Sequence, residues 1–298
     1  MDVHELTCQV KELAREKGAA LVGVAPVERF DPMPPLYDAV PKGQHPKDFL
    51  PKARSVISFA MPILPAVLEA PAVLAGEESD LIPEEARSSY YDQVYNRVGH
   101  VLHDYHLELI GQLIGQFLMQ CGYNAMIFPT TGVYPTFRNK SAAEVWAASP
   151  FRFTSGPFSH RHAATRAGLG EFGYNNLVLT REFGPRQRFN SVVTDAELVP
   201  DPLIDQPICL RDKCRLCLKA CPMQAIALRT DPGREDYRSI QSDDPQRIFI
   251  DTPSMSFPTL CISRAQSGTK YPVLGDCLRI CPIPKKAERL PQHLHHCR

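Results

Sequence analysis

The chain has 298 residues, which fits one large domain or two smaller ones. Hydrophobic residues make up 44% and charged residues 22%, close to ordinary globular usage, which argues against intrinsic disorder. Lysine plus arginine equals aspartate plus glutamate at 33 each, so the composition excludes a strongly basic nucleic-acid-binding protein but not a local basic patch. The 28 prolines argue against an all-helical bundle.

Targeting and membrane signals are not visible in the sequence. Charged residues interrupt the apolar ones at the N-terminus, unlike a secretory signal. The most apolar stretch, 56–75, contains Glu69 and three prolines, so we expect a buried strand followed by a kinked loop there. We therefore expect a soluble, cytoplasmic protein without membrane contact.

Helix and strand patterns occupy the chain up to residue 200. Apolar residues at three- and four-residue steps predict helices over 5–17, 90–119 and 160–167. Short apolar runs predict strands over 20–25, 55–61, 125–128, 177–180 and 190–194. The turn at 182–185 makes the last two strands either a hairpin or a strand–loop–strand. Beyond 200 the long periodic segments end, so we expect two domains, 1–200 and 201–298.

The cysteines are distributed unevenly. Cys8 and Cys121 stand alone, whereas the other eight of the ten fall between Cys209 and Cys297. In an intracellular chain such clustering favours a metal or iron–sulfur site over structural disulfides.

The strongest motif is Cys209-x4-Cys214-x2-Cys217-x3-Cys221-Pro222, whose end matches the C-x2-C-x3-C-P part of the bacterial ferredoxin run. A second ending of this type is Cys277-x3-Cys281-Pro282, and Cys261 lies between the two. In two-cluster ferredoxins the cysteine before the proline ligates the other cluster. We therefore expect one cluster on Cys209, Cys214, Cys217 and Cys281, and another on Cys221, Cys261 and Cys277.

This assignment gives seven ligands, because Leu274 stands where a standard second motif has its further cysteine. A remote cysteine (Cys297, Cys121 or Cys8), a non-cysteine group or an atypical second cluster remain alternatives. A structural zinc site would need only four of these thiolates. The doubled C-x3-C-P ending favours iron–sulfur clusters, and the histidine-rich tail around Cys297 fits a frayed terminus.

No nucleotide-binding motif occurs: G-x-G-x-x-G does not open a βαβ unit, and there is no Walker A run. The glycine-rich segment 167–195 permits close backbone approach to a bulky planar or phosphate-bearing ligand. The alternative is a plain system of glycine-rich turns with solvated arginines.

Together, the glycine-rich segment, the cysteine–proline run and Leu260-Cys261-Ile262-Ser263 resemble cobalamin-dependent epoxyqueuosine reductases and their relatives, the reductive dehalogenases, over most of 15–284. The resemblance implies an α/β (α+β) fold, with a nitroreductase-like cobalamin-binding domain over 1–200 and a ferredoxin-like domain with two 4Fe-4S clusters over 201–298. It also implies that the clusters feed electrons to a corrinoid, with a reduced ferredoxin or flavodoxin as the electron donor.

Site residues follow from the same resemblance, carried over by position. The residues expected to wrap the corrinoid are Gly168, Gly170, Gly173, Asn175 and Asn176, and those expected on its second approach are Gly184 and Arg186.

The sequence also departs from the family. Thr154 stands near the position of the catalytic aspartate of epoxyqueuosine reductases, and Tyr174 stands where they have a lysine. The helical-repeat extension that helps some of them hold tRNA is missing and the net charge is zero, which argue against tRNA as a partner. The twin-arginine signal common in reductive dehalogenases is missing too. We therefore expect a small organic substrate.

A phenol beside a cation that lowers its pKa can donate a proton to a developing carbanion. We therefore expect Tyr174 to be a catalytic acid, with His160 and Arg161, and His162 next to them, as its partners. The alternative is that this tyrosine only packs in the turn.

Three functions remain open. The first is a corrinoid-dependent reductase in which two clusters deliver electrons to cobalt. The second is an electron-transfer or corrinoid-reactivating protein without small-molecule turnover. The third is an iron–sulfur protein whose corrinoid site has been repurposed for a flavin.

Overall fold

The protein was analysed as a computed structural model. It describes residues 1–32, 40, 43–68, 92–130, 158–221, 224, 226–228, 254–256 and 276–284. In this part of the chain the fold is mixed α/β, as expected. Its helices do not include one with the length and apolar composition that crossing a bilayer requires.

A four-stranded sheet forms the centre of the first 200 residues, called the front half below, with its strands in the order β1-β2-β6-β3. The strands are β1 (Leu21–Pro26), β2 (Ser55–Pro62), β3 (Ala125–Ile127) and β6 (Gln187–Thr194). All three pairings are antiparallel, with Gly23 opposite Ser58 and Ser58 opposite Ser191. Since neighbouring side chains on a strand point to opposite faces, this register gives the sheet two different faces.

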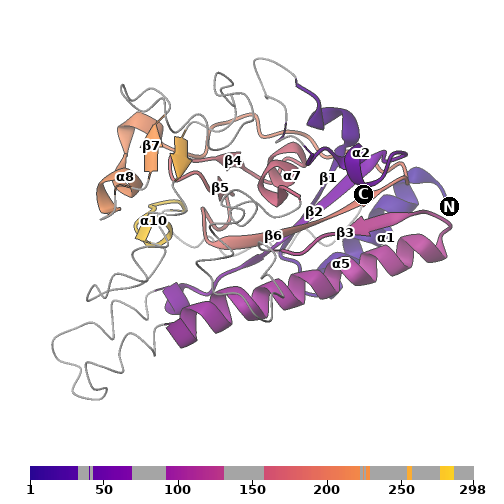
Figure 1. The fold of residues 1–298 in the computed structure, drawn as a ribbon, viewed down its shortest axis with the longest axis horizontal. Helices are drawn as coiled ribbons and strands as arrows, with labels where there is room; N and C mark the ends of the chain where they lie inside the picture. The colour runs from indigo at the N-terminus through magenta and orange to yellow at the C-terminus, as the bar shows by residue number, and fades with distance from the viewer. Residues whose placement is uncertain are drawn as a thin grey trace, which may run out of the picture.

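One face of the sheet packs against α1 (Val3–Glu16) and α5 (Leu102–Gln120), as Figure 1 shows. Helix α1 begins at Asp2, whose side chain accepts a hydrogen bond from the Glu5 amide at 2.8 Å, a cap that contributes about 1 kcal/mol. The core on this face consists of apolar residues at helical spacing on α1 and α5 and at alternating positions on the strands. They include Leu6, Val10, Ala14, Ile57, Phe59, Leu107, Ile110, Ile114, Leu118 and Val192.

The other face is covered by α7 (His160–Arg166) and by a small two-stranded sheet of β4 (Glu171–Phe172) and β5 (Val178–Leu179). Helix α7 comes close to the sheet because Gly23 has no side chain: a Cβ there would lie 2.5 Å from the Ala167 carbonyl oxygen. The glycine-rich segment therefore lies on this face and leads into β6 at the centre of the sheet.

The structure corrects one sequence prediction and decides another, since the last two predicted strands form a strand–loop–strand. The helical pattern over 90–119 is a π-helix, η2 (Asp92–Val101), followed by α5, rather than one α-helix. The last two predicted strands do not form a hairpin, because β5 pairs with β4 and β6 pairs with β2 and β3. Only a bridge between Thr180 and Gly184 closes the intervening turn.

The cysteine-bearing segments gather at one end of the molecule, away from the N-terminus (Figure 1). They include η3 (Arg211–Lys213), α8 (Leu216–Ala220) and α10 (Asp276–Arg279), and α8 and α10 pack together although about 60 residues separate them. Nearby are β7 (Ile226–Leu228) and β8 (Ser254–Ser256), which form an antiparallel pair. The remaining short helices, η1 (Val27–Phe30) and α2 (Pro46–Phe49), lie in the front half.

Candidate metal and cofactor site

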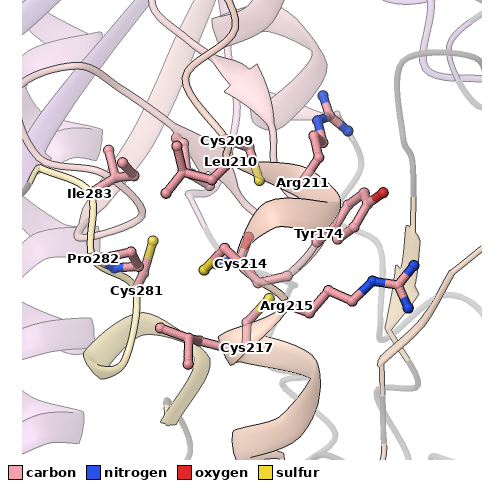
Figure 2. Close-up of a pocket in the computed structure, with 13 residues that line it drawn as sticks. Tyr174, Cys209, Leu210, Arg211, Cys214, Arg215, Cys217, Cys281, Pro282 and Ile283 are labelled. Atoms are coloured by element: carbon pink, nitrogen blue, oxygen red, sulfur yellow. The ribbon is translucent and has the colours of Figure 1, made fainter.

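Four cysteines from two distant segments line one pocket: Cys209, Cys214, Cys217 and Cys281. Figure 2 shows their sulfur atoms turned toward the same space. The pocket is partly open to solvent. These are the four residues predicted to share the first cluster, and all four are free thiols.

The first cysteine segment, residues 209–221, turns tightly and directs three of its thiols into the pocket. Arg211 and Arg215 both have positive φ, 50° and 51°, so the chain reverses on each side of Cys214. Non-glycine residues rarely adopt this conformation, and it recurs at functional sites. Helix α8 then starts directly after Arg215 and carries Cys217 on its first turn.

The electrostatics of the pocket fit a cationic metal group. Burial, together with the charges of Cys209 and Cys281, raises the pKa of the Cys217 thiol to about 12. Burial also raises the pKa of Cys281, opposed by a hydrogen bond from the Ile283 amide and by the Arg186 charge. Several desolvated thiolates in one pocket repel one another, and iron or zinc would supply the compensating charge that deprotonates them.

The four thiols of the pocket bear on which metal group it could hold. A zinc ion holds four thiolates at about 2.3 Å each, which brings the sulfurs within about 4 Å of one another. Within the described ranges, no three His, Cys, Asp or Glu side chains are grouped closely enough to hold a single metal ion. Four thiolates are the number that either a zinc ion or a 4Fe-4S cluster binds, so metal and sulfide analysis decides between the two.

Two of the three residues predicted for a second cluster lie at α8 and α10, which pack together. Cys221 ends α8 and Cys277 lies in α10, and neither lines the pocket. Cys261 lies outside the described residues, as does Cys297. Cys121 packs against the core below the sheet at the end of α5, and Cys8 lies on α1.

The predicted corrinoid glycines pack against the protein's own backbone. A Cβ at Gly168 would lie 1.9 Å from the Pro202 carbonyl oxygen, and one at Gly184 would lie 1.8 Å from that of Ile283. At Gly170 the Leu179 oxygen would be 2.3 Å away, and at Gly173 the Leu179 side chain 2.5 Å. Their lack of side chains is therefore explained by packing within the chain.

The polar residues carried over by the resemblance also make contacts within the chain. Asn175 and Asn176 are buried, and Asn176 adopts a φ of 57°. The Asn175 side-chain amide lies 3.5 Å from the Cys277 carbonyl oxygen. The Arg186 guanidinium donates to the carbonyl oxygens of Ile283 at 2.6 Å and of Cys281. Arg186 thus binds the backbone of the second cysteine segment, residues 277–284.

Tyr174 lies at the rim of the cysteine pocket rather than beside its predicted partners. The Arg211 guanidinium sits 5.6 Å from its ring centroid (Figure 2). Partial burial and a hydrogen bond with Asp212 raise the Tyr174 pKa, outweighing the lowering by Arg211. The pKa shift is opposite in direction to the expected cation-lowered one, because burial first and the nearby carboxylate second make this phenol a weaker acid.

His160 and Arg161 have other partners. The His160 ring nitrogens lie 2.9 Å from the Pro129 carbonyl oxygen and 3.1 Å from the Ser191 hydroxyl, and burial lowers its pKa to about 4. Arg161 donates to the Asn176 carbonyl oxygen at 2.7 Å. Both side chains are thus engaged in packing the α7 face, and the structure does not assemble the predicted acid. Thr154 lies outside the described residues.

The sequence analysis missed Glu171. Its carboxylate accepts hydrogen bonds from the amides of Ile208 at 2.7 Å and of Cys209 at 2.6 Å, and it forms an ion pair with Arg211 at 3.2 Å. No motif marks this residue. The only signal was an acidic residue between two glycines of a segment otherwise described by its arginines.

Comparison with known proteins gave no matching family model. Over 95 residues, or 30% of the chain, the sequence is 50% identical to a tetrachloroethene reductive dehalogenase of Desulfitobacterium hafniense, covering 17% of that protein. Over the whole chain it is 27% identical to the epoxyqueuosine reductase of Vibrio cholerae, covering 72% of it. The chain thus spans less than a fifth of the dehalogenase and most of the epoxyqueuosine reductase.

Solved structures give the same two likenesses. An epoxyqueuosine reductase in complex with a modified tRNA stem loop superimposes with a TM-score of 0.50 at 16% identity, over 96% of this chain and 67% of that one. A catabolic reductive dehalogenase superimposes with a TM-score of 0.54 at 16% identity, over 93% of this chain and 32% of that one. At this identity the likeness shows the fold alone.

The expectation that tRNA is not a partner is wrong. It rested on zero net charge and a missing extension, but the relatives that align over the full chain are epoxyqueuosine reductases, and one of the similar structures contains tRNA. Net charge says little here because it averages over a surface on which basic residues can still gather locally.

Proposed function

Because the chain belongs to the superfamily that includes epoxyqueuosine reductases and reductive dehalogenases, we propose that it is an iron–sulfur oxidoreductase. Its first cluster is held by Cys209, Cys214, Cys217 and Cys281. The observation that carries this proposal is the convergence of these four thiols, from segments about 60 residues apart, on one pocket.

The position of the pocket supports a path for electrons into the front half. Its wall includes Tyr174, Asn175 and Leu179 from the glycine-rich segment, in addition to the cysteine segments. A 4Fe-4S cluster in this pocket would supply single electrons at a low potential. Since that segment leads directly into β6 at the centre of the sheet, a redox cofactor in the front half would receive these electrons over a short distance.

Cobalamin is the cofactor that the resemblance implies for the front half, with a flavin as the alternative. The described glycines of this segment pack against the chain itself. Our proposal therefore assigns no chemical step to a corrinoid, and cobalt and flavin analysis of the purified protein decides between the two. A second cluster on Cys221, Cys261 and Cys277 belongs to the same proposal.

Anaerobic reconstitution with iron and sulfide tests the proposal. We expect about four irons and four sulfides for each cluster taken up and the electron paramagnetic resonance signal of a reduced 4Fe-4S cluster. Cys217→Ser should lose the cluster of this pocket, whereas Cys121→Ser, which changes a cysteine of the core below the sheet, should retain it. Zinc without acid-labile sulfide would refute the proposal.

The substrate class is proposed from the relatives. Epoxyqueuosine in a tRNA stem loop and chlorinated hydrocarbons such as tetrachloroethene are the two candidates that their names print. The reduced, reconstituted protein is incubated with each candidate substrate. Mass analysis of the nucleoside reports turnover of the tRNA stem loop, and halide release reports turnover of the chlorinated hydrocarbon. Turnover of neither would favour the second candidate function below.

That second candidate is electron transfer to another protein, or reactivation of its corrinoid, without small-molecule turnover. It is favoured by one observation: Tyr174, His160 and Arg161 are held by other groups and do not form an acid site. Loss of the cluster signal on mixing with an oxidised corrinoid protein, without any small substrate, would support this reading.

A further inference from the structure

We propose that Glu171 and Arg186 are positioning residues that hold the two cysteine segments against the front half and set the potential of the first cluster. This inference rests on the proposed function, since it needs a cluster in the pocket of Cys209, Cys214, Cys217 and Cys281. Neither residue touches the pocket space with its own side chain; each acts through the backbone of a cysteine segment.

Glu171 holds the start of the first segment. Its Oε1 atom accepts the amides of Ile208 and Cys209, at 2.7 and 2.6 Å, and its Oε2 atom pairs with Arg211 at 3.2 Å. Because Glu171 lies on β4, these bonds tie the ligand loop to the small sheet on the front half. They also keep the Cys209 amide bound to a carboxylate, so that this N–H is not available to a cluster sulfur.

Arg186 does the complementary work on the second segment. Its Nη1 donates to the Ile283 oxygen at 2.6 Å, and its Nη2 donates to the Cys281 oxygen and lies 3.5 Å from that of Arg279. These are carbonyls at the end of α10 and just beyond it, and an arginine side chain can donate to the last carbonyls of a helix. The bare Gly184 lets the Ile283 carbonyl approach the same turn.

The two contacts carry opposite charge and come from one short stretch of chain. An acid binds N–H groups beside Cys209, and a base binds C=O groups beside Cys281. A negative charge near a cluster makes its reduction harder and a positive charge makes it easier. Removing Glu171 should therefore raise the reduction potential, and removing Arg186 should lower it, although both changes loosen the pocket.

The experiment measures iron and sulfide retention, the paramagnetic resonance spectrum and the midpoint potential of the reconstituted full chain. The variants are Glu171→Gln, Arg186→Gln and the charge-retaining Arg186→Lys. The controls are Arg188→Gln, whose residue donates to the Gly99 carbonyl oxygen at 2.8 Å, and Glu108→Gln, whose residue accepts from the Thr130 amide at 2.9 Å. Both controls remove a charge of the same sign from a partly buried side chain that binds a backbone group outside the cysteine pocket.

We expect cluster retention to fall about tenfold in Glu171→Gln and Arg186→Gln, as for other residues that orient metal ligands. We expect the remaining cluster to titrate above the wild-type potential in the first variant and below it in the second. Arg186→Lys should return toward the wild-type potential. If Arg186→Gln does not fold, Arg186→Lys and Glu171→Gln carry the test.

Wild-type retention and potential in both glutamine variants would overturn the inference, as would shifts of the same sign, which loosened packing alone would produce. Failure of the proposed function gives a different result: the wild-type chain itself would take up no cluster. If the wild-type chain takes up a cluster and the variants match it in cluster retention and midpoint potential, only this inference is refuted.

Discussion

His160 is a buried imidazole whose two ring nitrogens have distinct tasks. The Pro129 carbonyl can only accept, so the ring nitrogen facing it must carry the proton, while the other accepts from the Ser191 hydroxyl. This arrangement favours the neutral ring and agrees with a pKa lowered by burial from 6.5 to about 4. His160, which was expected to be a partner of the acid Tyr174, therefore stabilises the contact between α7 and the sheet.

The first prediction concerns the pH dependence of stability. The unfolded chain takes up a proton on His160 near pH 6.5, whereas the folded chain does so only near pH 4. The contribution of His160 is thus fully present above pH 6.5 and decreases as the pH falls to 4, by about 3 kcal/mol. Urea unfolding at pH 7.5 and 4.5 measures it.

His160→Gln is the control for that experiment, because it retains a donor for the Pro129 carbonyl and does not titrate. The decrease in unfolding free energy between the two pH values should be smaller in the variant by this amount. Equal decreases in the two proteins would show that His160 is not the group responsible.

The second prediction concerns Gly184, which has a φ of 58° and no room for a Cβ beside Ile283. Gly184→Ala should lower the unfolding free energy by about 1–3 kcal/mol more than a positive-φ glycine in open space, and reduce iron uptake. Gly122→Ala is the matched control, since Gly122 has a φ of 88° with nothing within 4 Å of a Cβ. That control should lose only about 1–2 kcal/mol. Equal losses would contradict the role given to Ile283.

Residue roles were only partly predictable. The spacing of the cysteines predicts that Cys209, Cys214, Cys217 and Cys281 lie together, because ferredoxin-type ligand loops have a fixed residue spacing that can be recognised in a sequence. Whether they bind a cluster stays a prediction. Partners of Tyr174 were not predictable, because Arg211 and Asp212 reach it across about 40 residues of chain and no spacing encodes that contact.

At the scale of elements, the approach of α7 to β1 decides where the glycine-rich segment lies. Gly23→Ala places a methyl group 2.5 Å from the Ala167 oxygen, and should lower the unfolding free energy by about 1–3 kcal/mol. Gly115→Ala on α5 meets its nearest atoms at 3.7 Å and should raise it by about 0.5–1 kcal/mol, since alanine favours a helix over glycine. Urea unfolding of both variants measures the difference. A tolerated Gly23→Ala would contradict the close packing of α7.

Elements with strong local patterns were predicted well. The expected helix over 5–17 is α1, and the expected strands over 20–25 and 55–61 are β1 and β2, each within one or two residues. The pairing of β5 with β4 was missed, because two-residue strands carry too few side chains for a period to show. The π-helical start of the long helix was missed because its apolar spacing resembles that of an α-helix.

At the scale of the whole molecule, the structure joins a sheet domain to a cysteine-rich end through one stretch of chain. Residues 167–195 supply the wall of the cysteine pocket, the contacts of Glu171 and Arg186, and strand β6 at the sheet centre. A mixed α/β fold was predictable from the patterns, whereas the antiparallel order of the sheet was not.

The central claim is that the thiols of Cys209, Cys214, Cys217 and Cys281 hold one iron–sulfur cluster. The most direct measurement is the paramagnetic resonance spectrum, with iron and sulfide content, of the anaerobically reconstituted chain and of the Cys281→Ser variant. Because Cys281 comes from the second segment, a 4Fe-4S signal that is present in the wild type and lost or altered in Cys281→Ser is the predicted result. A signal unchanged by Cys281→Ser, or a wild type that binds only zinc, would contradict it.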